Sequence, residues 1–190
     1  MNPSTPHPTA LNLPQANPLP ADTQAYFDLC EAKLGMVPNV LRAYAHNIDK
    51  LNAFSAMYND LMLGASALSK LEREMIAVVV SAVNRCHYCL VAHGAAVRVL
   101  GSPELGEALI TNYRVANITP RQRAMLDFSV MMSEASAKIE EADRAALRDH
   151  GFTDADIWDI AAVASFYNMT NRMASAIDMR PNAEYHAMAR

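Results

Sequence analysis

The sequence is poor in glycine, in long apolar runs and in clustered positive charge. Only 6 of its 190 residues are glycine, and its net charge is -4. No apolar run reaches the roughly eighteen residues that a membrane-spanning helix needs. No cluster of lysine and arginine forms a stripe that could follow a phosphate backbone. These absences weigh against a membrane protein and against a nucleic-acid-binding protein.

A secretory signal is also lacking. The N-terminus, Met1 to Pro6, has neither a basic start nor an apolar segment. We therefore expect a cytoplasmic protein whose 3 cysteines are reduced at rest. A close cysteine pair in that compartment is typical of catalysis or metal binding rather than of a structural disulfide.

Residues that favour helix are abundant. The hydrophobic fraction is 52%, with much alanine and methionine. Ser69–Glu72 and Thr119–Gln122 have the form of capping boxes, and Ser102 precedes a proline at the first position of a helix. Asp22 is expected to cap the first helix, which ends at Gly35. Roughly eight helices and no convincing strand predict an all-α fold.

The chain length suits one domain with a proline-rich extension. Residues 1–20 hold six of the ten prolines and show no helical pattern. We expect this arm to be flexible by itself or packed on a neighbouring subunit. Residues 21–190 then form the all-α domain, which is long enough to bury a substantial core.

An offset of 84 residues relates two of the expected helices. It sets Ser69–Asn84 beside Thr153–Asn168, with five identical positions, and both segments begin with a hydroxyl residue suited to capping. Thr170 and Met173 occupy the positions of the two cysteines in the second copy. This pattern is typical of a duplicated helix pair that kept its chemistry in one half. Two buried helices rich in alanine and valine could also match by chance.

The chemistry is expected between Glu74 and His93. Glu74 lies twelve residues before Cys86, Cys89 follows three residues later, and His93 four residues after that. Three consecutive valines in this stretch could form a buried strand, but the strong helix start at Ser69 favours a buried helix.

Helical spacing gathers part of this set. Cys86, Cys89 and His93 fall within a stripe of roughly 60°, while His87 and Tyr88 point away from it. Cys89 and His93 are one turn apart, so the imidazole can accept the thiol proton. A Cys-x-x-Cys pair of this kind can attack an oxidant with one sulfur and close a disulfide with the other.

The residues around Cys86 and Glu74 are expected to change the pKa values of these two side chains. With Asn84 as N-cap, Cys86 lies in the first turn, where free amides stabilise a thiolate and can lower its pKa to about 3.5–7.5. Glu74 sits in an apolar helix, and partial burial there could raise its pKa toward that of a proton shuttle. The alternative is a surface ion pair with Lys70, one turn earlier.

A zinc-binding module is the metal alternative. It would use Cys86, Cys89, His93 and His87, but His87 is off the stripe and no second Cys/His cluster supplies a fourth ligand. We therefore expect no metal and no cofactor.

The spacing of Glu74, Cys86, Cys89 and His93 resembles that of the alkyl hydroperoxide reductase D-like proteins, within the carboxymuconolactone decarboxylase superfamily. The resemblance is stronger to their peroxidase-related branch and covers most of the chain except the arm. Members of the family carry a histidine just before the second cysteine, where this sequence has Tyr88.

This resemblance implies an all-α helical bundle that forms a homo-oligomer (dimer, trimer or hexamer) and reduces hydroperoxides. It implies that Cys89 attacks the peroxide after its proton leaves through His93 toward Glu74. Cys86 would then resolve the sulfenic acid as a disulfide, which a dithiol or a protein reductant reduces. The helix-dipole argument instead favours Cys86 as the more acidic thiol, so the choice of attacking sulfur stays open.

Other functions compete with a peroxidase. The pair could serve a disulfide oxidoreductase that does not act on peroxides, or a redox-sensing module. A decarboxylase or lactone-processing enzyme of the same superfamily is a further alternative, although such relatives generally lack the dithiol.

Overall fold

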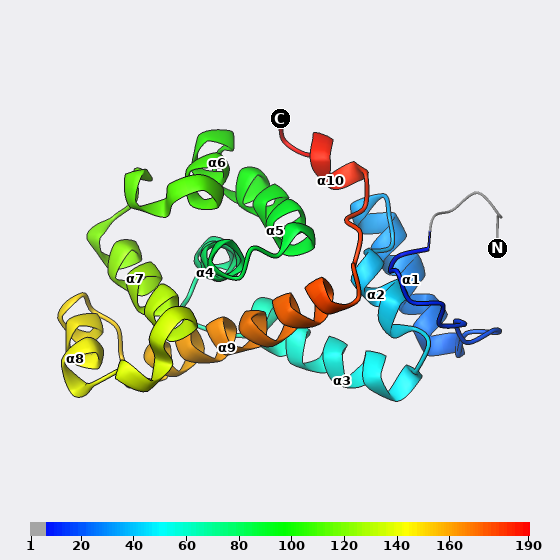
Figure 1. Cartoon of the computed structure of the whole chain (residues 1–190), viewed down its shortest axis with the longest axis horizontal. Coiled ribbons are helices and arrows are strands. Elements are labelled where there is room, and N and C mark those ends of the chain that lie inside the picture. Colours follow the sequence, from blue (N-terminus) through cyan, green and yellow to red (C-terminus); the bar gives the residue numbers. More distant parts are fainter. Residues whose placement is uncertain (1–6) are drawn as a thin grey trace.

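The computed structural model describes residues 7–190, so the start of the proline-rich arm, Met1–Pro6, lies outside the described residues. The α-helices, in chain order, are α1 (Ala21–Leu34), α2 (Asn39–Tyr44), α3 (Ile48–Tyr58), α4 (Lys70–Val83), α5 (His87–Leu100), α6 (Pro103–Asn112), α7 (Pro120–Ala135), α8 (Glu141–Asp149), α9 (Asp154–Ala176) and α10 (Glu184–Ala187). A π-helical turn, η1 (Asn59–Leu63), extends α3, and the 3-10 turns η2 (Tyr113–Val115) and η3 (Ser136–Lys138) extend α6 and α7. Within residues 7–190 the regular elements are all helices, as predicted (Figure 1).

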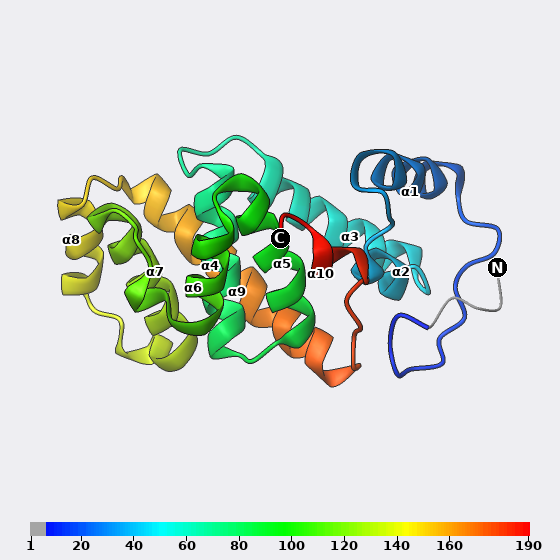
Figure 2. The ribbon, with the colours of Figure 1, turned by 90° about the horizontal axis from the view of Figure 1, so that it is seen from above.

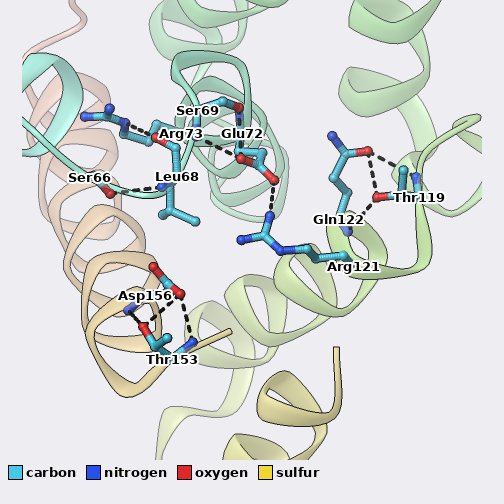
Figure 3. Close-up of polar contacts among 10 residues, drawn as sticks. All are labelled: Ser66, Leu68, Ser69, Glu72, Arg73, Thr119, Arg121, Gln122, Thr153 and Asp156. Atoms are coloured by element: carbon cyan, nitrogen blue, oxygen red, sulfur yellow. Dashed lines mark hydrogen bonds and ion pairs between the residues drawn. The ribbon is translucent and has the colours of Figure 1, made fainter. Parts of the chain in front are cut away.

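Helix starts follow the capping signals of the sequence in most cases. Ser69, Thr119 and Thr153 each accept a hydrogen bond from the third residue of their helix, whose side chain binds back to the cap (Figure 3). Gly35 ends α1 in the left-handed region, at φ 71°. The predicted cap at Asp22 is wrong: Pro20 precedes α1, and Asp22 already belongs to its first turn.

Helix α4 forms the centre of the molecule. Figure 1 shows it end-on, with α5, α6, α7 and α9 around it. Its residues Met75 to Val80 are at most 1% exposed, so this helix is apolar on every side. The valine run is therefore a buried helix, as its capping box predicted. Within the described residues, no helix is both long and apolar enough to span a membrane.

The two helices related by the 84-residue offset, α4 and α9, pack against each other. Equivalent side chains meet there, because Asn84 Nδ2 donates to Asn168 Oδ1 at 3.0 Å. The copies differ just beyond this point. Helix α4 ends at Val83 and the chain turns through Arg85, whereas α9 continues unbroken to Ala176. Only α4 is therefore followed by a new helix start, and the two cysteines lie there.

The described part of the arm is bound to the C-terminal segment of the same chain. The Ala10 N–H donates to the Ile177 carbonyl and the Arg180 N–H to the Pro8 carbonyl, both at 2.9 Å. Residues 177–190, which include α10, run from the end of α9 to α5, and the chain ends beside α5 (Figure 2). Met179 of this segment belongs to the same buried cluster as Cys86 and Cys89.

Candidate active site

The junction between α4 and α5 places the first cysteine. Arg85 has a positive φ of 53°, and this turn lets the Cys86 N–H donate to the Ser81 carbonyl at 3.0 Å. Cys86 is itself the N-cap of α5, and its sulfur accepts the Cys89 N–H at 3.4 Å. The predicted N-cap, Asn84, is wrong: it is the C-cap of α4, because the chain needs two further residues to turn.

The two thiols of the pair are free and share one hydrogen bond. Cys86 Sγ and Cys89 Sγ lie 2.8 Å apart. The hydrogen bond from the Cys89 thiol lowers the pKa of Cys86 to about 7, and the Cys89 N–H, the Ser175 side chain and His93 act in the same direction. The same hydrogen bond, together with burial, raises the pKa of Cys89 well above its ordinary value. When one thiol of the pair ionises, the negative charge therefore lies on Cys86.

Glu74 and His93 form a partly buried hydrogen-bonded pair. Glu74 Oε2 lies 2.7 Å from His93 Nδ1, and these side chains are 12% and 14% exposed. The Tyr167 hydroxyl lies 3.5 Å from the same nitrogen, and its ring meets the imidazole edge-on. Glu74 thus pairs with His93 rather than with Lys70, and it fixes the orientation of the imidazole.

A buried polar cluster stands behind Cys89. Asn171 is fully buried; its Oδ1 accepts from Asn84 Nδ2 and its Nδ2 donates to Ser81 Oγ, both at 3.0 Å. The Asn171 and Ser81 side chains lower the pKa of Cys89, against the effect of burial. The sequence interpretation missed both residues. Ser81 had a signal in the sequence, as a polar side chain in the apolar run of α4, whereas Asn171 lies in a polar stretch of α9 and had none.

One sulfur of the pair opens on a cavity of about 460 Å³. Cys89 and His93 are among the residues that line it, while Cys86 is not and has no exposed surface. The walls are mostly apolar and contain six of the seven tyrosines of the sequence: Tyr26, Tyr44, Tyr58, Tyr88, Tyr167 and Tyr185. Each comes from a different helix, so no sequence pattern could have grouped them.

The two residues between the cysteines, His87 and Tyr88, lie in different surroundings. His87 is exposed, and its ring centroid lies 6.5 Å from that of His186. Tyr88, predicted to point away from the reactive stripe, is buried in the wall of the same cavity. Its hydroxyl accepts the Val40 N–H at 3.2 Å and so ties α2 to α5.

The third cysteine, Cys30, is buried and also lines the cavity. Burial raises its pKa, so this thiol is protonated at neutral pH.

Among residues 7–190, no three His, Cys, Asp or Glu side chains are arranged to hold a metal ion.

Comparison with known proteins places this arrangement in a family. A sequence model of the carboxymuconolactone decarboxylase family matches residues 49–105, which include Glu74, Cys86, Cys89 and His93. The chain is 69% identical to an uncharacterized peroxidase-related protein from Silicibacter sp. TM1040, with 98% of each chain covered and a TM-score of 0.95. It is 46% identical to another, described as an alkylhydroperoxidase AhpD core, from Ralstonia eutropha JMP134, with the same coverage and a TM-score of 0.93. None of the curated proteins matches significantly.

A more distant likeness shows the fold alone. The debrominase Bmp8 is 19% identical, with 89% of this chain and 90% of that chain covered and a TM-score of 0.74.

The two peroxidase-related structures show that the fold is that of the alkyl hydroperoxide reductase D-like proteins. The chain belongs to the peroxidase-related branch of these proteins, within the carboxymuconolactone decarboxylase superfamily. The predicted family and fold class are confirmed.

Proposed function

We propose that the protein is a thiol-dependent hydroperoxide reductase in which Cys86 and Cys89 cycle between dithiol and disulfide. The observation that carries this proposal is the orientation of the pair. Cys89 opens on the cavity beside His93, and Cys86 stands behind it at 2.8 Å. A peroxide entering the cavity meets Cys89 first, and the resolving sulfur is already within reach.

The position of Cys89 at the cavity and the lower pKa of Cys86 favour different sulfurs as the attacking group. Access to the cavity decides between them. Cys86 holds the charge at rest but is fully buried, whereas Cys89 lines the cavity. A thiolate without a path to its substrate cannot react, whatever its pKa. We therefore assign the attack to Cys89. Its proton passes to His93, whose Nδ1 is held by Glu74 and whose other ring nitrogen is free to accept it.

The reaction balances over two steps. The Cys89 thiolate attacks the peroxide, the O–O bond breaks, and the alkoxide leaves as an alcohol with the proton held by His93. The Cys86 thiolate then attacks the sulfur of the resulting sulfenic acid, and the hydroxide that leaves takes a proton from solvent to become water. The sum converts one hydroperoxide and one dithiol into an alcohol, water and a disulfide. A dithiol or protein reductant returns the disulfide to the dithiol, and Cys86 is the better leaving group because its pKa is the lower.

Single-cysteine variants test this proposal. We expect Cys89→Ser to abolish peroxide consumption with a dithiol donor. Cys86→Ser should complete one attack only and stop at a sulfenic acid, which a dimedone probe and mass spectrometry detect. Cys30→Ser is the matched control, since that thiol lines the same cavity without a partner cysteine, and it should keep full turnover. Activity that survives both Cys86→Ser and Cys89→Ser would end the proposal.

The proton relay has a separate test. Glu74→Gln and His93→Gln should each lower kcat/KM for a hydroperoxide by roughly 10²–10⁴-fold, the usual contribution of general acid–base catalysis. Tyr167→Phe removes only a 3.5 Å contact to His93 and should have a much smaller effect. Equal losses for all three variants would point to a packing role instead.

The competing functions give different results. A disulfide oxidoreductase would reduce or oxidise protein disulfides in preference to peroxides, and a redox sensor would react once without appreciable turnover. A decarboxylase of the superfamily would keep its activity in both cysteine variants.

We also propose that the protein is a cytoplasmic homo-oligomer. Light scattering would test the assembly, and cell fractionation would test the location.

A further inference from the structure

The charged side chains that line the cavity directly have one sign. Of the residues that line it, Lys33 and Lys70 are the charged ones besides the titratable His93, and none is aspartate or glutamate. This distribution stands out in a chain whose net charge is -4. Within the described residues, neither lysine has a carboxylate within ion-pair distance, since the ion pairs found there involve other side chains. The cavity therefore presents two unpaired ammonium groups.

The exposed members of the lining show where the cavity opens. Both lysines are exposed, and they are accompanied by four large apolar side chains: Leu29 at 47%, Leu34 at 46%, Leu63 at 56% and Met173 at 45%. They come from α1, η1, α4 and α9. Apolar side chains left exposed around an opening mark a binding site more often than an ordinary surface. This mouth combines apolar contact with positive charge.

The inner end of the cavity is different in character. Cys89 is 3% exposed there and is accompanied by Phe166, Tyr167 and Ala92, all buried. The volume of about 460 Å³ lies within the roughly 300–1,000 Å³ of pockets that enclose drug-sized ligands. A ligand that fills it would place an apolar body along the walls, one end at the thiol and the other at the lysines.

We propose that the cavity binds amphipathic anions, with the anionic head group between Lys33 and Lys70 and the apolar chain directed toward Cys89. Resting on the proposed function, the substrate class is then hydroperoxides of long-chain acids, or of other lipids with a single anionic head. Such a molecule loses one peroxide oxygen as water and leaves as the hydroxy acid, while Cys86 and Cys89 become a disulfide. Neutral hydroperoxides would react without help from the lysines.

Binding of unreactive probes tests the ligand class without any redox step. Calorimetry with decanoate, decyl phosphate and decanol compares a carboxylate, a phosphate and a neutral head on the same chain. We expect both anions to bind more tightly than decanol, and lengthening the chain to lower Kd by about fourfold per methylene until the cavity is full. Preference for one anion identifies the head group. No binding of any probe, as expected if a second copy of the chain covers the mouth, would overturn the proposal.

A charge-matched pair of double variants isolates the lysines. Lys33→Met with Lys70→Met should weaken anion binding by roughly three- to tenfold, because exposed ion pairs contribute modestly. The same variant should leave decanol binding unchanged. Lys50→Met with Lys138→Met removes the same charge from exposed sites outside the cavity and should change neither. Equal weakening in both double variants would mean that only the net charge matters, and it would refute the assigned site.

Kinetics separate this proposal from the one on which it rests. With a fatty-acid hydroperoxide, the Lys33→Met, Lys70→Met variant should raise KM and leave kcat unchanged, and with the methyl ester of the same hydroperoxide it should change neither. A small neutral hydroperoxide reports the dithiol chemistry alone. If that compound is inert while the anionic probes bind, the proposed reaction is wrong and the ligand class stands. The ligand class is wrong if the small neutral hydroperoxide is reduced but the KM and kcat values for the acid and for its methyl ester respond alike in all variants.

Discussion

Cys86 and Cys89 are chemically identical residues that the fold makes unlike. Cys86 caps α5 and accepts hydrogen bonds from the Cys89 thiol and N–H, which stabilise its thiolate. Cys89 lies one turn into the helix, faces the cavity, and donates its proton to its neighbour. In the proposed reaction, Cys89 is thus the attacking sulfur with access to the cavity, and Cys86 is the more acidic resolving sulfur. The local sequence predicted the acidity of Cys86 from its place at the start of a helix, although it assigned the cap to Asn84.

The lowered pKa of Cys86 is testable without any substrate. In reduced protein, ultraviolet absorbance should show one thiolate appearing near pH 7. Cys86→Ala should remove this transition, and Cys89→Ala should move it upward because the strongest hydrogen bond to Cys86 is lost. A transition that is unchanged in Cys86→Ala would assign the acidity to another group.

Stability should follow the same ionisation. Between about pH 7 and the ordinary thiol value of about 9, the unfolded chain holds a proton on Cys86 that the folded chain has released. The free energy of unfolding of the reduced protein should therefore rise with pH in this window, and that gain is lost as pH falls through about 7. Denaturant unfolding of wild type and Cys86→Ala at several pH values measures the difference.

At the scale of elements, the break between α4 and α5 makes the site. Where α9 continues, α4 stops at Val83, and the turn at Arg85 starts a new helix whose N-cap is Cys86. Arg85 has φ 53°, a conformation that costs a residue with a side chain about 1–2 kcal/mol. The strain is local and lies at the one point where the two related helices diverge.

Replacement of Arg85 tests that strain. Arg85→Gly should raise the free energy of unfolding by up to about 1 kcal/mol, since glycine adopts positive φ without a Cβ clash. Arg85→Ala is the control, because it removes the same exposed side chain but keeps the Cβ. Chemical denaturation of both variants gives the comparison, and equal stabilities would show that backbone strain is not the cause.

At the scale of the whole molecule, the C-terminal segment covers the cysteine pair. Met179 belongs to the same buried apolar cluster as Cys86, and it lines the cavity together with Tyr185. The segment is held at three places. The arm binds residues 177 and 180, Asn182 bonds to the backbone of Val37 and Asn39, and the buried Arg98 of α5 donates to the carbonyls of Tyr185 and Met188.

Loosening this cover should expose the buried thiol. Arg98→Ala removes two charge-assisted hydrogen bonds of 3.0 and 2.9 Å, each worth about 1.5–3 kcal/mol. We expect Cys86 to react roughly ten- to a hundredfold faster with a maleimide, read by mass spectrometry, because local opening of the segment becomes more frequent. Arg180→Ala, on the exposed side of the same segment, should leave the rate near that of wild type. Unchanged labelling in Arg98→Ala would mean that another element shields Cys86.

The amino-acid sequence by itself determined the helices, most of their caps and the four residues of the proposed redox site. Capping boxes, apolar periodicity and the spacing of Glu74, Cys86, Cys89 and His93 depend on residues close together in the chain. They can therefore be read from the amino-acid sequence alone. They predicted an all-α fold and the family, and both are confirmed. The errors at Asp22 and Asn84 are shifts of two residues at helix ends, where competing hydrogen-bond partners decide the boundary.

Tertiary structure alone decided which sulfur faces a cavity, what Glu74 binds, and which side chains surround the dithiol. The 2.7 Å contact between Glu74 and His93 joins two helices, and the tyrosines and lysines of the cavity come from elements far apart in the chain. Such contacts depend on where α1, α2, α9 and the C-terminal segment lie relative to the cysteine pair at the start of α5. No local pattern encodes them, because each requires the position of residues dozens of places away.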